Sequence, residues 1–340
     1  MKRRCHVFCL GAILLLAACG AQPATTPAGQ PADTGARKLA VVTTVSPITN
    51  IVYNIGGERI SLTGIVPEGV NSHTFEPAPS DAQKLAQADL ILVNGLGLEE
   101  PTLKLAEANK KADTEIILLG DQTITPEQYM FDFSFPKAAG SPNPHLWPNP
   151  RYALRYAELA RDALSKRDPA GASYYAQNYD AFKARIDVLD AAIKATVASI
   201  PEQNRKLLTY HDSWAYFAPV YGMTVLGAIQ PADFSEPSAQ EVATLITQLR
   251  QEQVPAVFGS EVFPSPVLEQ IAKEAGVQFV DELRDDDLPG APGEATHSYI
   301  GLMTNNLKVM ARALGGDPSL MDSVDPSNVP GIDNSVEQAQ

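Results

Sequence analysis

The chain has 340 residues, of which 40 are acidic and 26 are basic, and its formal net charge at pH 7 is −14. A chain this acidic is poorly suited to bind nucleic acid, because such binding depends on basic side chains that neutralise phosphates. The three cysteines all lie within the first 19 residues, so the rest of the chain has no thiol for disulfides, metal ligation or catalysis. Any metal site beyond residue 19 must therefore use His, Asp or Glu.

The first 18 residues have the layout of a secretory signal peptide. Three basic residues at 2–4 precede an apolar run at 7–18, which ends in small residues and is too short to span a membrane comfortably. The sequence LAAC at 16–19 resembles a bacterial lipobox, which implies cleavage before Cys19 and attachment of lipid to its thiol. The alternative is an ordinary signal peptide followed by a chance cysteine.

The segments at the two ends of the remaining chain are expected to be loose. Pro, Ala, Thr and Gly dominate residues 19–37, which we expect to form a flexible tether between the lipid and a folded body. Residues 316–340 are polar and acidic, and we expect a loose tail there. Between tether and tail lie roughly 280 residues, enough for two domains of ordinary size.

Short runs rich in Val, Ile and Leu alternate with helical patterns over 38–168. This alternation is typical of a parallel α/β sheet with right-handed crossovers. Strands are predicted at 38–45, 60–67, 89–96 and 115–119, and helices at 46–57, 79–88 and 101–110.

One long helical pattern follows, at 169–203. No Gly or Pro interrupts residues 175–200, Pro201 ends the pattern, and the helix would be roughly 40 Å long. Such a helix could be a rigid connection between two domains or a long surface helix of one of them. Its apolar residues recur every three or four positions and form a one-sided stripe of Tyr175, Tyr179, Phe182, Ile186, Leu189 and Ile193.

The strand–helix alternation returns over 204–315, without close sequence similarity to the first region. We therefore predict two Rossmann-like α/β lobes, 38–168 and 204–315, joined by the helix at 169–203. In the second lobe, strands are predicted at 205–212, 223–229, 255–263 and 277–283, and helices at 213–222, 238–252, 265–276 and 297–314.

Three of the five histidines fall where predicted strands end or in a stiff loop. His73 follows the second strand, His145 lies in the proline-framed loop NPHLWPNP at 143–150, and His211 ends the first strand of the second lobe. Asp281 ends the last strand of that lobe. Ligands bind α/β domains beyond the carboxyl ends of the strands, so these four side chains could converge between the lobes. Three imidazoles and one carboxylate make a tetrahedral zinc environment without cysteine.

Each of these residues also has an ordinary interpretation. A single histidine in a loop is more often a surface residue, and Asp281 could be a helix cap or a solvated acid. We assign no metal to His297, whose position is typical of a helix start, or to His6, which lies in the signal peptide. The residue pattern alone leaves a metal site and ordinary surface positions both open.

Four segments together resemble the solute-binding lipoproteins of zinc and manganese ABC transporters. The similarity covers about residues 38–315 and implies the fold called the helical backbone metal receptor. In that fold two α/β lobes are bridged by one long rigid helix, and metal is bound in the cleft between them. The segments are NSHTFEPAPSDAQKLAQADLILVNGLGLE (71–99), NPHLWPNP (143–150), YHDSWAYFAPVYGM (210–223) and FSEPSAQEV (234–242).

The resemblance implies a ligand set of His73, His145, His211 and Asp281. The family often has a Thr/Ser-Asp-Ser/Ala step where this chain has VDE at 280–282, so the fourth ligand has alternatives. Those alternatives are the nearby acids Asp285, Asp286 and Asp287, in a loop that could fold over the cleft or stay solvated.

Two further side chains are candidates for supporting the site. Glu261, at the end of a predicted strand, could accept a hydrogen bond from a ligating imidazole. Trp147, two residues after His145, could shield the site from water.

We expect the metal to be Zn²⁺, with Mn²⁺ as the alternative. Three imidazoles and one carboxylate suit zinc better than manganese, which prefers oxygen ligands. Manganese members of the family often have Glu at the position of His211. Many zinc members carry a His-rich acidic loop between the first two ligands, whereas residues 125–141 of this chain contain no histidine.

The resemblance implies a receptor and not an enzyme. It would capture a divalent transition metal outside the cytoplasmic membrane and deliver it to an ABC transporter permease and its ATPase. We expect a monomer, anchored to the membrane through lipid on Cys19, with no nucleic-acid partner.

Two other classes of function stay open. Three histidines and a water on zinc would suit a hydrolytic enzyme, although the chain has no H-E-x-x-H motif and no evident pair of general bases. An adhesin would use the acidic surface and lipid tether for display and would not depend on metal.

Overall fold

The first parallel sheet is formed by four short aliphatic runs in the computed structural model, which describes residues 37–262, 266–281 and 283–329. Its strand order is β2-β1-β3-β4, and β1 pairs with β2 from Leu39↔Ile60 to Thr43↔Gly64. All four predicted strands are confirmed, as β1 (Leu39–Thr43), β2 (Ile60–Gly64), β3 (Leu90–Val93) and β4 (Glu115–Leu118).

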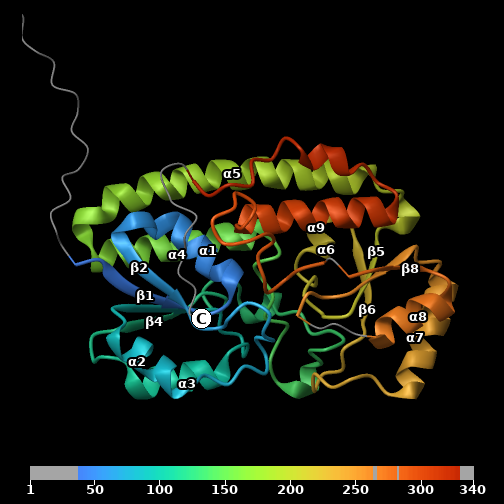
Figure 1. Cartoon of the computed structure of the whole chain (residues 1–340), viewed down its shortest axis with the longest axis horizontal. Helices are drawn as coiled ribbons and strands as arrows, with labels where there is room; N and C mark the ends of the chain where they lie inside the picture. Colours follow the sequence, from blue (N-terminus) through green and yellow to red (C-terminus); the bar gives the residue numbers. More distant parts are fainter. Residues whose placement is uncertain (1–36, 263–265, 282, 330–340) are drawn as a thin grey trace, which may run out of the picture. The chain divides into compact units, whose positions relative to one another are not determined.

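Helices cover both faces of this sheet (Figure 1). Leu90 and Leu92 of β3 belong to the apolar cluster shared with α1 and α4, whereas Ile91 and Val93 belong to the cluster beneath α2 and α3. Every residue of β3 is therefore buried, as expected for a central parallel strand. The helices are α1 (Ser46–Gly56), α2 (Pro79–Gln87), α3 (Glu100–Asn109) and α4 (Pro150–Arg167).

The second lobe repeats this topology. Its strand order is β6-β5-β7-β8, which is again second, first, third, fourth along the chain, and all its pairs are parallel. The two lobes thus share one folding pattern although their sequences show no close repeat. The elements are β5 (Lys206–Thr209), β6 (Thr224–Ala228), β7 (Ala256–Phe258), β8 (Gln278–Val280), α6 (Ala218–Tyr221), α7 (Ala239–Glu252), α8 (Pro266–Ala275) and α9 (Tyr299–Leu314).

The helix predicted at 213–222 is wrong for its first half, because α6 begins only at Ala218. Pro219 stands in the first turn of α6, where a proline is tolerated. A helix running from 213 would place Pro219 in its interior, where the ring would clash with the carbonyl of Ala215.

The long helix α5 (Ala172–Ser199) bridges the two lobes (Figure 1). Its 28 residues correspond to about 42 Å. It contacts α1 and α4 of the first lobe and α6 and α9 of the second, so the interpretation as a surface helix of one lobe is wrong. The predicted apolar stripe is buried except for Tyr179, which is half-buried beneath the guanidinium of Arg161 at 4.5 Å from its ring centre.

The expectation of a loose tail is wrong for residues 316–329. A short turn in this segment contacts both α5 and α9, and Met321 and Val329 are buried. The amide of Asn54 on α1 donates to Asn328 Oδ1 at 2.9 Å, and its Oδ1 accepts from the Val329 N–H at 2.9 Å. The tail therefore returns from the second lobe to the first, because its few apolar residues find cover there. Residues 330–340 lie outside the described part.

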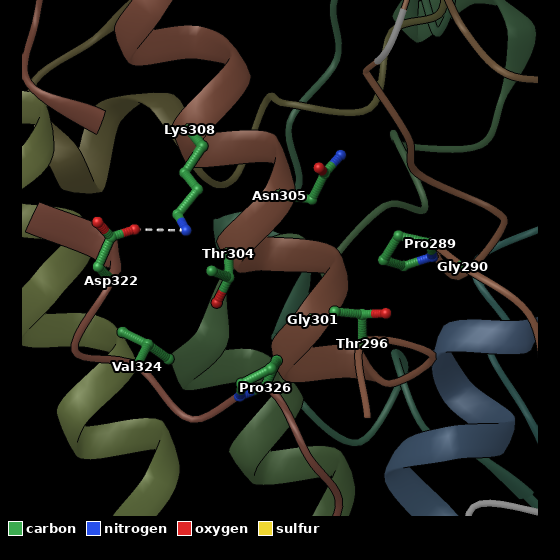
Figure 2. A pocket seen from close by; sticks show the side chains of 10 residues that line it. All are labelled: Pro289, Gly290, Thr296, Gly301, Thr304, Asn305, Lys308, Asp322, Val324 and Pro326. Atoms are coloured by element: carbon green, nitrogen blue, oxygen red, sulfur yellow. Dashed lines mark ion pairs between the residues drawn. The ribbon is translucent and has the colours of Figure 1, made fainter. Parts of the chain in front are cut away.

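The tail also lines a pocket against α9 (Figure 2). Lys308 of α9 and Asp322 of the tail form an ion pair at 2.6 Å on its wall, beside Thr304 and Asn305. None of the predicted metal ligands lines this pocket.

The predicted signal peptide and nearly all of the tether lie outside the described residues. Among the helices between Arg37 and Val329 that the structure describes, none is both long enough and apolar enough to cross a membrane.

A buried carboxylate links α5 to both lobes. Asp190 of α5 is 3% exposed and accepts hydrogen bonds from Tyr221 of α6 at 2.7 Å, from Lys194 at 2.8 Å and from Arg151 of α4. Burial alone would raise the pKa of Asp190, but these three donors together lower it below the ordinary value. The carboxylate is thus ionised in the folded protein and holds α4, α5 and α6 together.

We predict that Asp190→Asn lowers the free energy of unfolding at pH 7 by about 2–3 kcal/mol, because it weakens charged hydrogen bonds in a buried place. Because the folded pKa is depressed, this contribution is present above about pH 4 and is lost as the pH falls through the folded value. Urea unfolding between pH 3 and pH 7 measures it. The control is Asp187→Asn on the same helix, where the carboxylate is 42% exposed and the expected loss is below about 1 kcal/mol. Equal losses at the two positions would contradict the prediction.

Candidate metal centre

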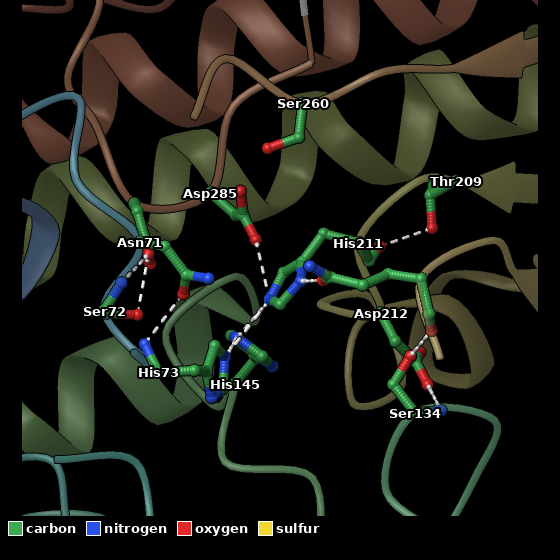
Figure 3. Close-up of polar contacts among 12 residues, drawn as sticks. Asn71, Ser72, His73, Ser134, His145, Thr209, His211, Asp212, Ser260 and Asp285 are labelled. Atoms are coloured by element: carbon green, nitrogen blue, oxygen red, sulfur yellow. Dashed lines mark hydrogen bonds and ion pairs between the residues drawn. The ribbon is translucent and has the colours of Figure 1, made fainter. Parts of the chain in front are cut away.

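Three imidazole rings meet between the two lobes (Figure 3). The Nε2 atoms of His73 and His145 are 3.1 Å apart, those of His73 and His211 3.2 Å, and those of His145 and His211 3.0 Å. His73 comes from the loop after β2, His145 from the loop before α4 and His211 from the end of β5. The structure thus brings together the three histidines selected from the sequence, and they are the metal-capable group found among the described residues.

The size of this triangle matches the coordination distances of a small cation. The centre of a triangle with these sides lies about 1.8 Å from each nitrogen, so an ion about 1 Å above the plane would be 2.0–2.1 Å from all three, the usual Zn–N distance. The rings therefore form three corners of a tetrahedron whose fourth corner is open to another ligand.

Outward hydrogen bonds fix the tautomers of two rings. His145 Nδ1 lies 2.8 Å from Asn143 Oδ1, and His211 Nδ1 lies 2.7 Å from Gln230 Oε1. The Asn143 amide group also donates to the backbone oxygen of Asp212 at 2.7 Å, which leaves its Oδ1 as the acceptor. The proton of His145 is accordingly on Nδ1, and its Nε2 lone pair faces the centre. The same holds for His211 with Gln230 as acceptor.

The loops that carry His73 and His145 contain the same type of asparagine turn. Asn71 Oδ1 accepts from the backbone N–H of His73 at 2.9 Å, and Asn143 Oδ1 accepts from that of His145 at 3.0 Å. Asn side chains commonly close such short turns. The Asn-x-His sequence thus occurs at both loops, and this repetition is the signal that could have identified Asn143 in advance. Gln230 could have been found as the polar residue after β6.

A second asparagine holds the His145 loop from behind. Asn94, at the end of β3, donates to the carbonyl of Pro144 at 3.0 Å and accepts from the Tyr156 hydroxyl at 2.6 Å. Glu99 accepts hydrogen bonds from the backbone N–H of Asn94 and of Gly95. The proline-framed loop is therefore fixed by the sheet as well as by its own stiffness.

The environment keeps the imidazoles neutral. Burial lowers the pKa of His73 and of His145 well below the ordinary value, and the neighbouring His211 lowers both further. Burial also lowers the pKa of His211, although Asp286 and Gln230 act in the opposite direction. Neutral imidazole is the form that binds metal.

Asp285 lies beside the triangle, next to His211 (Figure 3), although it is not a member of the group whose ligand atoms all lie within 4.8 Å of one another. Its Oδ2 lies 3.6 Å from His211 Nε2, and this buried oxygen has no hydrogen-bond partner in the described part of the chain. Burial raises the pKa of Asp285 well above the ordinary value, and the adjacent Asp286 raises it further. A cation in the triangle would stabilise the ionised form and give the free oxygen a partner.

The other two acids of this loop contact the first lobe. Asp286 accepts from the Ser72 hydroxyl at 2.7 Å, and Asp287 accepts from the Gly69 N–H at 2.8 Å. The loop is therefore buried against the His73 loop, and the alternative of a solvated acidic loop is wrong.

The structure does not bring Asp281 into the cluster. Its side chain is exposed, and it does not belong to the group of metal-capable residues found among the described positions. The physical reason lies in the chain path after β8. The strand ends at Val280, and the acid that lies next to His211 comes from the loop after the buried Leu283 and not from the strand end.

Glu261 contacts the acidic loop instead of an imidazole. Its Oε1 accepts from the backbone N–H groups of Asp285, Asp286 and Asp287 at 2.9, 3.1 and 3.0 Å. Burial, with a further contribution from Asp285, raises the pKa of Glu261 to about 8. Its position therefore supports the loop that carries Asp285, a different role from the one expected.

Trp147 is fully buried beside the site. Its ring packs edge-to-face against His145 with centres 5.1 Å apart, and its Nε1–H donates to the carbonyl of Asp285 at 2.8 Å. The indole thus covers one imidazole and also holds the acidic loop.

His297 lies apart from the three-histidine group. It is buried directly before Ser298, the residue that caps the N-terminus of α9, and its Nε2 is 3.7 Å from Glu68. The predicted position at a helix start is confirmed.

Comparison with known sequences bears on this site. The sequence model of the family described as zinc-uptake complex component A, periplasmic, matches residues 41–313. The chain belongs to this family. Relatives of this chain include the manganese-binding lipoprotein MntA of Halalkalibacterium halodurans and the iron-binding protein YfeA of Yersinia pestis. MntA is 30% identical over 92% of this chain and 99% of its own length. YfeA is 33% identical over 84% and 89%.

Solved structures of component A relatives have the same architecture. The periplasmic zinc-binding protein TroA of Treponema pallidum has a TM-score of 0.74 and 28% identity, covering 82% of this chain and 99% of TroA. The Mn-bound periplasmic metal-binding protein of Candidatus Liberibacter asiaticus has a TM-score of 0.71 and 27% identity, covering 82% and 100%. The predicted fold and family are thereby confirmed.

Membership in the component A family places the chain among the extracytoplasmic metal-binding components of uptake transporters. The predicted location outside the cytoplasm, at a membrane, agrees with the words periplasmic and lipoprotein in these names. The names differ in the metal, since zinc, manganese and iron all occur among them.

Proposed function

We propose that this chain captures Zn²⁺ outside the cytoplasmic membrane and delivers it to an ABC transporter permease and its ATPase. The observation that carries the proposal is the triangle of three neutral imidazoles whose Nε2 atoms are 3.0–3.2 Å apart. Nitrogens that present lone pairs to one another cannot all be satisfied by hydrogen bonds among themselves, whereas one cation satisfies all three.

The proposed ligands are His73, His145, His211 and Asp285, with Asp285 in place of Asp281. The first lobe supplies two imidazoles, and the second supplies one imidazole and the carboxylate. Four protein ligands fill a tetrahedral shell and leave no position for an activated water. This closed shell supports a receptor over the hydrolytic enzyme that the sequence left open.

Zinc is favoured by the chemistry of the ligands. Three nitrogen donors and one oxygen suit a borderline cation better than manganese, which prefers oxygen ligands. The alternative is a manganese receptor of the same family, and relatives named for manganese support it. Zinc outbinds manganese at most nitrogen-containing sites, so affinity alone does not identify the physiological ion. The metal content of cells that lack this chain would separate the two, since the transported ion is the one that becomes depleted.

We predict that wild-type protein binds one Zn²⁺ per chain and that His145→Ala lowers the affinity at least about tenfold, because a fixed ligand is lost. Titration calorimetry on metal-stripped protein measures the affinity, and circular dichroism checks that the variant is folded. The matched control is His297→Ala, which removes another buried histidine and should change the affinity little. Equal losses for the two variants would mean that His145 is not a ligand. Wild-type protein that binds no metal would return the adhesin to consideration.

We predict that Asp285→Asn lowers zinc affinity about tenfold or more, because the charged ligand on the open side is replaced by a neutral amide. Asp281→Asn, which changes the exposed acid at the end of β8, should leave the affinity within about twofold of wild type. The same calorimetric titration decides between them. The opposite order of effects would restore Asp281 as the fourth ligand.

Lipid on Cys19 is proposed as the membrane anchor. We predict that Cys19→Ala moves the protein from the membrane fraction to the soluble fraction. Stable anchoring requires acyl chains, and without the Cys19 thiol lipid cannot be attached. Immunoblotting of fractionated cells measures the distribution. If the variant stays in the membrane fraction as fully as wild type, the lipobox interpretation fails.

A further inference from the structure

The His73 ring is held differently from the other two. Asn143 and Gln230 accept from Nδ1 of His145 and His211, but Nδ1 of His73 has no hydrogen-bond partner in the described part of the chain. Two phenyl rings hold His73 instead. Phe234 stacks on it with ring centres 4.5 Å apart and planes 20° apart, and Phe135 lies against it at 5.5 Å.

The two phenyl rings differ in how firmly they are fixed. Phe135 is 7% exposed, and the preceding Ser134 donates from its backbone N–H to Asp212 at 3.1 Å and from its hydroxyl to the carbonyl of Gln230 at 2.6 Å. Phe234 belongs to the loop between β6 and α7, where most of its neighbours are exposed. Phe135 is therefore a fixed wall of the site, whereas Phe234 covers His73 from a surface loop of the opposite lobe.

The backbone at Phe234 is in an unusual conformation. Its φ of +58° lies in the left-handed region, which is unfavourable for a bulky side chain. The Phe234 N–H donates to the carbonyl of Pro231 at 2.9 Å, and Asp233 Oδ1 accepts from the Ser235 N–H at 3.1 Å. These short-range bonds form a turn around Phe234 and direct its ring onto His73.

We propose that Phe234 is a positioning residue for His73 and controls release of the metal. The proposal rests on the function proposed above and specifies how the site opens. While the phenyl ring stacks on His73, the imidazole keeps its Nε2 in the triangle. When the 231–237 loop withdraws, His73 is the ligand that can rotate away, because no amide holds its outer nitrogen. The metal then leaves on the His73 side, and the other ligands stay in place.

The first test is the rate at which Zn²⁺ leaves the loaded protein, measured by stopped flow with a chromogenic chelator as the trap. Phe234→Ala should release zinc roughly three to ten times faster, as expected for loss of one aromatic pair. Phe234→Tyr keeps the ring and should restore the wild-type rate. Phe133→Ala is the matched control, because Phe133 is an exposed phenylalanine near Phe135 in sequence and makes none of these ring contacts. Release from Phe234→Ala at the wild-type rate would overturn the inference.

The second test is a double-mutant cycle on zinc affinity with His73→Ala, Phe234→Ala and the double variant. If Phe234 acts through His73, its replacement should have no further effect once the imidazole is absent. An equal effect in both backgrounds would show that Phe234 acts on the fold and not on His73, which also overturns the inference. Failure of the proposed function is distinguishable, because then wild-type protein itself would bind no zinc.

Discussion

Three nitrogen lone pairs held about 3 Å apart are the constraint on which the rest of this structure depends. Left to themselves, imidazoles in such a place would turn outward or take up protons. Here burial disfavours the protonated forms, and the outer nitrogens of two rings are tied to amide oxygens, so the inner nitrogens cannot become donors. The proline-framed loop, its Asn143 turn and the bond from Asn94 all serve to keep one of these rings in place.

The carboxylates in and next to the acidic loop at 285–287 differ in their hydrogen-bond partners. Asp286 Oδ2 and Asp287 accept hydrogen bonds from groups of the first lobe, and Glu261 accepts from backbone N–H groups of the loop itself. One buried carboxylate oxygen, on Asp285, is left without a partner beside the triangle. A second oxygen of the loop, Asp286 Oδ1, also has no hydrogen-bond partner among the described residues, and a bound cation at the triangle would give the Asp285 oxygen a partner.

The sequence predicted the parts of this protein that follow from local periodicity and missed those that follow from chain path. Aliphatic runs and turn residues located the eight strands in the described part of the chain. The rule about strand ends selected His73 and His211, and the proline-framed loop selected His145. The same rule did not bring Asp281 next to the histidines, because β8 stops at Val280 and the acid beside His211 lies on a loop whose course is set by tertiary contacts. Similarly, the polarity of 316–329 concealed its apolar residues Met321 and Val329, whose burial depends on helices far away in sequence.

The return of this C-terminal segment has a mechanical consequence. The chain crosses from the first lobe to the second through α5 and comes back through residues 316–329, where Asn328 pairs with Asn54 of α1. Two domains linked once can swing apart about a single hinge. Two crossings that flank a shared helix remove most of that freedom, since wide separation would break a buried amide pair. Exchange of an ion with the surroundings is then favoured by small displacements of the loops around it, and the body of the molecule can remain a stiff frame throughout.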